Sequence, residues 1–322
     1  MERRTFLAAC AATAAAPWAR ADTGYPSQPI RWVVPYPAGG GTDVLARTVA
    51  EAMRGGLGQQ IVVDNRPGAS TNTGSQIVAT AKPDGYTVMS ADNALLAYNE
   101  HLYRRLPFHP DKDFTYIGGL SRFPLVLVVN PAFAAQTFQD FLAYVKAHPG
   151  QVNYASPGNG SPHHLAMELF KHRTQTFLTH IPYRGAAPAV QDVMGGQVPC
   201  MFLDLAAGLP VIQSGKVRAL AIGAARRAAA LPHVPTLAEV GVADAEVYAF
   251  QGLLGPAGLP PAITARLNAA LNQALAAPEV VERMRAFGME PLAGTPEQFH
   301  ALARAEARRW GPVIAATGVK LD

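Results

Sequence analysis

The chain has 322 residues, 49% of them hydrophobic, and its 27 Lys and Arg side chains nearly balance 23 Asp and Glu. No basic run carries interleaved aromatic residues, so the composition does not indicate binding to nucleic acid. A chain of this length usually exceeds what one hydrophobic core supports, which predicts two lobes.

The first 21 residues, MERRTFLAACAATAAAPWARA, are predicted to be a signal peptide and not part of the fold. Arg3 and Arg4 precede a short apolar stretch, as in a twin-arginine signal, although Sec export stays an alternative because Glu2 departs from that pattern. Cleavage after about Ala21 would leave a nearly neutral periplasmic protein. The apolar run is too short to span a bilayer.

Cysteine use limits the chemistry of the mature chain. Cys10 would leave with the signal, so Cys200 would be the only cysteine. This excludes an internal disulfide and a metal site built on cysteines. A lipoprotein box at Cys10 is disfavoured because almost no apolar region precedes it.

The pattern after the signal alternates short β-branched runs with helical periods. Strands are predicted at 30–36, 60–65, 86–91, 124–131, 152–156, 217–224 and 251–258, and helices at 42–54, 74–82, 137–147, 162–171, 262–276, 278–287 and 296–315. Such alternation predicts an α/β fold with a parallel sheet. The chain is expected to cross between its lobes within 116–129 and 246–256.

Two glycine-rich corners stand where a predicted strand meets a helix. In RWVVPYPAGGGTDVLART, residues 31–48, three glycines precede a helix that Thr42 or Asp43 could cap. In the second corner, SPGNGSP, Ser161 is a good N-cap and Pro162 suits the first helical position. Helix N-termini attract anions, so two such corners predict a cleft that closes over a small anion.

A dinucleotide-binding fold is an alternative for the first corner, because Asp64 follows the glycines at about the right distance. The motif is not fully matched, however, because Val44 stands where its third residue, a Gly or Ala, should allow the helix to pack on the strand. Asp43 would also place a carboxylate beside the pyrophosphate. The sequence therefore disfavours nucleotide binding.

Metal and hydrolase chemistry are disfavoured at the second corner. His163 and His164 are adjacent on a helix and point to different faces, with no carboxylate at metal spacing. Ser161 lies near His163, but the segment lacks the G-x-S-x-G turn of a serine hydrolase.

The whole chain resembles a known family. The segments YPAGGGTDVLAR, VVDNRPGASTNTGSQIVA, KPDGYTV, DFTYIGGL, LVLVVNP, SPGNGSPHHLAMELF, IPYRGAAPAVQDVMGGQV, SGKVRALAIGAARRAAALPHVPTLAEVG and QGLLGPAGLPP together resemble the Bug family over roughly residues 28–320. These are extracytoplasmic substrate-binding proteins similar to the receptors of tripartite tricarboxylate transporters.

The resemblance implies the type II periplasmic binding protein fold, with two α/β lobes joined by a hinge. Lobe 1 would comprise residues 22–122 and 246–322, and lobe 2 residues 123–245. The cleft between them would hold a small organic carboxylate and no cofactor or metal. The resemblance leaves the acid open, from di- and tricarboxylates to amino-acid-like and aromatic acids.

The resemblance also implies site residues, which would act through backbone N–H groups and water. The first carboxylate clamp would be Tyr36, Pro37, Ala38, Gly39, Gly40 and Asp43, and the facing clamp Ser156, Gly158, Asn159, Gly160 and Ser161. A third loop would add Tyr183, Arg184 and Gly185, and Asp204 would be a variable contact preferring a ligand amine or hydroxyl. Phe250 and Leu259 depart from the family pattern, which puts the apolar wall of the pocket in doubt.

The predicted function is that of a noncatalytic, monomeric receptor that delivers a carboxylate to a membrane permease. A solute sensor for a signalling partner would share every pocket residue, and a secreted hydrolase is the rival of a different class.

Overall fold

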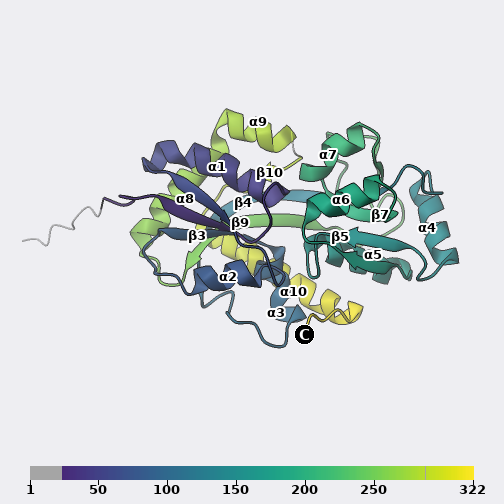
Figure 1. Ribbon diagram of the computed structural model, residues 1–322, viewed down its shortest axis with the longest axis horizontal. Helices are drawn as coiled ribbons and strands as arrows, with labels where there is room; N and C mark the ends of the chain where they lie inside the picture. The colour runs from purple at the N-terminus through teal and green to yellow at the C-terminus, as the bar shows by residue number, and fades with distance from the viewer. Residues whose placement is uncertain (1–23, 287) are drawn as a thin grey trace, which may run out of the picture.

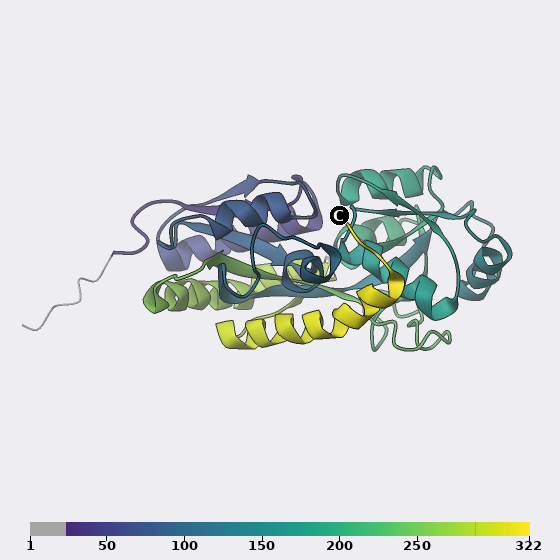
Figure 2. The same cartoon turned by 90° about the horizontal axis from the view of Figure 1, so that it is seen from below.

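The computed structural model describes residues 24–286 and 288–322, so the predicted signal peptide lies outside the described residues. The architecture is α/β, with two lobes side by side that are joined by long strands (Figures 1 and 2). This confirms the predicted fold class. No helix within the described ranges is long and apolar enough to cross a membrane.

The first lobe begins with three parallel strands separated by helices. Its elements are β1 (Ile30–Val34), α1 (Gly41–Leu57), β2 (Ile61–Asn65), α2 (Asn72–Ala79), β3 (Thr87–Asp92), the π-helical turn η1 (Ala94–Tyr98) and α3 (Asn99–Leu102). β1 lies between β2 and β3, with Trp32 opposite Val63 and Val88. The carboxyl ends of parallel strands meet at one edge of a sheet, so the loops after β1 and β3 come together there.

The second lobe repeats this arrangement. Its elements are α4 (Phe138–Ala147), β5 (Asn153–Ser156), α5 (Pro162–Thr174), β6 (Thr179–Pro182), α6 (Ala186–Met194), β7 (Cys200–Asp204), α7 (Leu205–Gln213) and β8 (Arg218–Ile222). β5 pairs with β6 and β7 in parallel. The strand-to-helix loops after β5 and β6 therefore meet at one edge, as they do in the first lobe.

Two long antiparallel strands, β4 (Phe114–Val129) and β9 (Tyr248–Pro256), join the lobes. β4 pairs with β9 as far as Pro124, and from Leu125 onward it pairs with β7 and β8. The predicted parallel pairing is confirmed within each lobe, whereas β4, β8, β9 and β10 (Glu290–Pro291) add antiparallel pairs that the sequence did not predict. The exact division into lobes at residues 122 and 246 stays a prediction.

The chain ends in three helices, α8 (Pro261–Ala276), α9 (Pro278–Ala286) and α10 (Pro296–Thr317). α10 starts with a capping box between Thr295 and Gln298, and it ends at Gly318 in a left-handed conformation. It contacts η1 and β4 but also α5 of the second lobe. Figure 2 shows α10 running along one side of the molecule toward that lobe.

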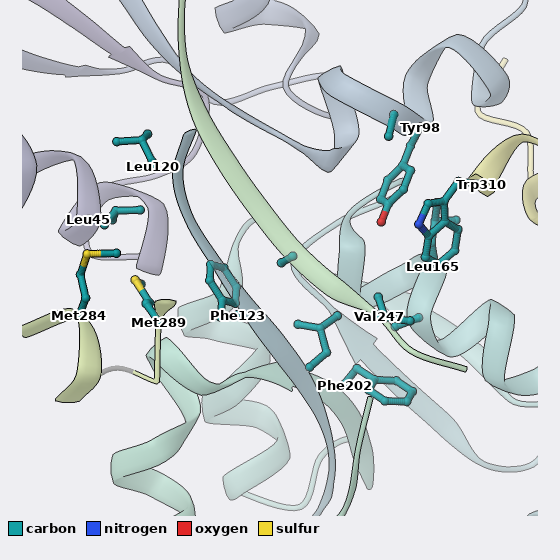
Figure 3. Close-up of a cluster of buried hydrophobic side chains, with 14 of the residues drawn as sticks. Leu45, Tyr98, Leu120, Phe123, Leu165, Phe202, Val247, Met284, Met289 and Trp310 are labelled. Carbon is teal, nitrogen blue, oxygen red and sulfur yellow. The ribbon is translucent and has the colours of Figure 1, made fainter. Parts of the chain in front are cut away.

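The main hydrophobic core continues from one lobe into the other (Figure 3). Phe123 on β4 and Phe202 on β7 belong to the same buried cluster as Tyr98 and Trp310. The rings of Tyr98 and Trp310 meet edge to face with their centroids 5.0 Å apart. α10 is thus a third packed connection between the lobes, besides β4 and β9.

Candidate functional site

The loop between β1 and α1 presents a helix end that no side chain caps. α1 begins at Gly41 with Gly40 as N-cap, so the prediction that Thr42 or Asp43 caps it is wrong. Gly39 has a φ of 82°, in the left-handed region that favours glycine. The first N–H groups of an α-helix have no partner within the helix. Those of α1 are therefore available to a ligand.

Asp43 supports this loop from inside the protein. Its carboxylate accepts hydrogen bonds from the Gly39 N–H at 2.9 Å and Asn65 Nδ2 at 3.0 Å, and it pairs with Arg47 at 3.0 Å. Asn65 also donates to the Tyr36 carbonyl. Burial raises the pKa of Asp43, but the hydrogen bonds from Arg47, Gly39 and Asn65 outweigh burial and lower it below its ordinary value.

We expect Asp43→Asn to lower the free energy of unfolding at pH 7 by about 1 kcal/mol, a modest value because Arg47 is half exposed. The folded pKa of Asp43 is lowered, so its contribution is present at neutral pH and is lost as the pH falls below about 3.9 and through that pKa. Urea unfolding at pH 7 and pH 3 should therefore show the two proteins converging in acid. Asp244→Asn, on an exposed side chain, is the control. A constant difference at both pH values would contradict this role.

The second predicted clamp, the loop after β5, satisfies most of its own N–H groups. The Gly158 N–H donates to Ser156 Oγ at 3.1 Å, and the Gly160 N–H donates to His164 Nδ1 at 3.1 Å. The Ser161 N–H donates to the Gly158 carbonyl, and its hydroxyl caps α5 by accepting the His164 N–H. This loop consequently offers a ligand fewer donors than the sequence predicted.

Two stacked histidines hold this loop in place. His180 Nε2 lies 2.6 Å from Ser156 Oγ, and the rings of His164 and His180 stack with centroids 4.0 Å apart. Burial lowers the pKa of His164 to about 4 and that of His180 to about 3. Both rings are therefore neutral at neutral pH, which lets His164 Nδ1 accept the Gly160 N–H.

The third predicted loop leads into a second uncapped helix. Gly185, with a φ of 118°, is the N-cap of α6, and no side chain caps that helix. Tyr183 donates its hydroxyl to Asp192 at 2.6 Å, whereas Arg184 is exposed. A Cβ on Gly185 would lie 3.4 Å from Pro37 Cγ, so the two lobes meet at this glycine.

A cavity of about 150 Å³ lies where these loops come together. Among the predicted residues it is lined by Tyr36, Pro37, Ala38 and Gly40 from the first lobe and by Ser161, Arg184, Gly185 and Asp204 from the second. The ends of both uncapped helices also line it, through Gly41, Thr42, Ala186 and Ala187, which the sequence reasoning missed. The helix that follows Gly185 could have been found, because AAPAVQDVM has helical periodicity after a glycine.

An outer cavity of about 650 Å³ adjoins the inner one and shares Tyr36, Pro37, Pro157, Ser161, Arg184 and Gly185 with it. The predicted residues Gly158, Asn159 and Tyr183 line only this outer cavity. Across it, Ser70 Oγ donates to the Asn159 carbonyl at 2.6 Å. Gly39, Asp43, Ser156 and Gly160 line neither cavity.

The inner cavity also has a polar floor, which contains Asp92, Asp204 and His163. Asp92 accepts the Tyr36 hydroxyl at 2.6 Å and the Ala94 N–H at 3.1 Å. Asp204 Oδ2 lies 3.1 Å from His163 Nε2. Burial raises the pKa of Asp92 despite the hydrogen bonds from Tyr36 and Ala94. These side chains stand on β3, β7 and α5, next to the strands that join the lobes.

Phe250 and Leu259, which left the apolar wall of the pocket in doubt, do not line the inner cavity. Phe250 is buried and packs with Phe299 in a separate core cluster. Leu259 is buried in the main core, close to Gly255. The apolar part of the floor comes instead from Phe123 and Ala249.

Two α/β lobes, joined by long strands and facing each other across a small cavity, define the class of periplasmic solute-binding proteins. The profile of the family described as "Tripartite tricarboxylate transporter family receptor" matches residues 45–319, and the chain belongs to this family.

Relatives agree with this assignment. Protein BugT from Bordetella pertussis strain Tohama I is 39% identical over 302 residues, which cover 94% of this chain and 92% of BugT. The solved structure of an R. palustris protein with adipate has a TM-score of 0.88 and 33% identity, covering 91% of this chain and 98% of that one. The structure of MatC from Rhodopseudomonas palustris with bound malate has a TM-score of 0.86 and 33% identity, covering 90% of this chain and 100% of that one.

Proposed function

We propose that this protein is an extracytoplasmic receptor that closes over a small organic carboxylate and delivers it to the membrane subunits of a tripartite transporter. The observation that carries the proposal is the meeting of two uncapped helix N-termini, α1 from one lobe and α6 from the other, at one cavity. Such ends concentrate free N–H donors and positive potential, which suits an anion. The neighbours that hold adipate and malate support a carboxylate as that anion.

We propose further that the protein binds without turnover. The Ser161 hydroxyl is engaged as a helix cap and accepts a hydrogen bond from the His164 N–H. His163, which does line the cavity, faces Asp204. This arrangement favours holding a solute over activating a serine nucleophile.

The proposal also covers export of the protein, its oligomeric state and its division into two lobes. Residues 1–21 would direct export to the periplasm, with cleavage after about Ala21, and the mature protein would act as a monomer. Residues 22–122 with 246–322 would move as one lobe and residues 123–245 as the other, because β4 changes its pairing partner between Pro124 and Leu125.

A thermal-shift panel tests the function. A cognate acid at a hundredfold excess over its Kd should stabilise the fold by about 2.7 kcal/mol, which corresponds to a Tm rise of about 5 to 10 °C. The panel would contain succinate, glutarate, malate, adipate, citrate, β-alanine and γ-aminobutyrate, with their amides as controls that lack the carboxylate. NAD and ATP should give no shift. A shift with NAD and with no carboxylate would contradict the receptor proposal.

A further inference from the structure

The deep end of the inner cavity is acidic. Asp92 is 6% exposed and Asp204 is 4% exposed, and both line the cavity. Among the described residues that line it, Arg184 is the only Lys or Arg; it is exposed and lies at the mouth shared with the outer cavity. The uncapped helix ends and two buried acidic side chains thus line the same small cavity.

The floor also holds two buried polar atoms that have no hydrogen-bond partner among the described residues. His163 Nε2 faces Asp204, while its buried Nδ1 has no hydrogen-bond partner. Gln251 donates through Nε2 to Thr42 Oγ1, while its buried Oε1 has none. Buried polar atoms are nearly always hydrogen-bonded, so the Gln251 amide oxygen on this floor lacks a donor.

Apolar neighbours strengthen the preference of this floor for a cationic hydrogen-bond donor. Phe123 and Ala249 stand beside the polar floor and are themselves buried. A low local dielectric strengthens the attraction of a carboxylate for a cation and the repulsion of a second anion. Phe123 and Ala249 face each other in the pairing of β4 with β9, which places the floor on the joining strands.

We propose that the inner cavity selects a small zwitterionic carboxylate, whose carboxylate lies at the ends of α1 and α6 and whose ammonium group lies on the floor with Asp92 and Asp204. This inference rests on the proposed receptor function and narrows its ligand class. A dicarboxylate of the same length would place its second carboxylate beside the buried side chains of Asp92 and Asp204, and like charges repel each other. Repulsion of this kind lets a binding site reject a compound that resembles its ligand. The floor thus favours a solute class different from the adipate and malate held by the neighbours.

Isothermal titration calorimetry with length-matched pairs tests the inference. β-Alanine should bind at least about tenfold more tightly than succinate, and γ-aminobutyrate at least about tenfold more tightly than glutarate, where tenfold corresponds to about 1.4 kcal/mol. Asp204→Asn and Asp92→Asn should each shrink this preference. Asp244→Asn, on the surface of the second lobe, should leave it unchanged.

The outcomes separate the two proposals. If succinate and glutarate bind the wild-type protein as tightly as their amino partners or more tightly, the zwitterion inference is overturned and the receptor function stands. If no acid of either series binds but malate, adipate or citrate does, the inference is overturned and the receptor function stands. If none of these carboxylates binds, both are overturned. The wild-type comparison decides the inference even if a floor variant fails to fold, which circular dichroism would reveal.

Discussion

Replacing Ala186 with proline is expected to weaken binding of the cognate carboxylate by about 10- to 150-fold without unfolding the protein. Ala186 is the first residue of α6, where proline is well tolerated because the N–H that it lacks has no partner in the helix. Gly185 has a ψ of 170°, an extended value compatible with a following proline. The change thus removes one donor from the anion site, and a charge-assisted hydrogen bond contributes about 1.5 to 3 kcal/mol. Calorimetric titration measures the loss.

Ala186→Ser is the matched control, because it keeps the N–H and the Cβ. Its affinity should stay within about threefold of the wild-type value, a difference of less than 1 kcal/mol. Equal affinity of the proline and serine variants would show that the end of α6 does not hold the carboxylate, and the site proposed here would have to be moved.

Trp310→Ala is expected to lower the free energy of unfolding by about 3 to 5 kcal/mol, the largest effect that we expect of any single change. Trp310 is 1% exposed, its ring packs on Tyr98, and its Nε1 donates to Glu306. Figure 3 shows it beside Tyr98 of the first lobe, and Leu165 of the second lobe belongs to the same buried cluster. Truncation would therefore open a cavity where the two lobes share one core. Urea unfolding followed by circular dichroism measures the effect.

Arg308→Ala serves as the control for this change, since Arg308 lies exposed on the same helix. Its unfolding free energy should stay within about 0.5 kcal/mol of the wild-type value. A loss of less than 1 kcal/mol in Trp310→Ala would mean that α10 does not connect the lobes energetically.

The sequence predicted those elements whose pattern is local. The capping residue Ser161 and the helix start at Pro162 are confirmed, because a hydroxyl before a proline is a short-range signal. The predicted helix at 296–315 is confirmed as α10, which has a readable capping box. β4 was predicted only from residue 124, since Gly118 and Gly119 interrupt its apolar run although both lie within the strand.

The site could be predicted only in part, because its chemistry depends on which N–H groups the fold leaves unpaired. The glycine corner at Gly39 was found from sequence, but that its N–H is already bonded to Asp43 follows from three-dimensional packing. Asp92 gave no local signal, since a polar residue at a strand end is common. It lies near Asp204 and His163 only because β3, β7 and α5 converge on the joining strands.

The hydrogen bond that bridges the cleft, from Ser70 to the Asn159 carbonyl, and the close approach of Pro37 to Gly185 involve protein atoms alone. Their free energy therefore adds equally to the bound state of every ligand and sets the fraction of molecules in the binding-competent arrangement. The apparent Kd is the intrinsic Kd divided by that fraction. If the proposed site is correct, a change at Ser70 would alter the affinity for all solutes together, whereas changes at Asp92 and Asp204 would alter the choice among them.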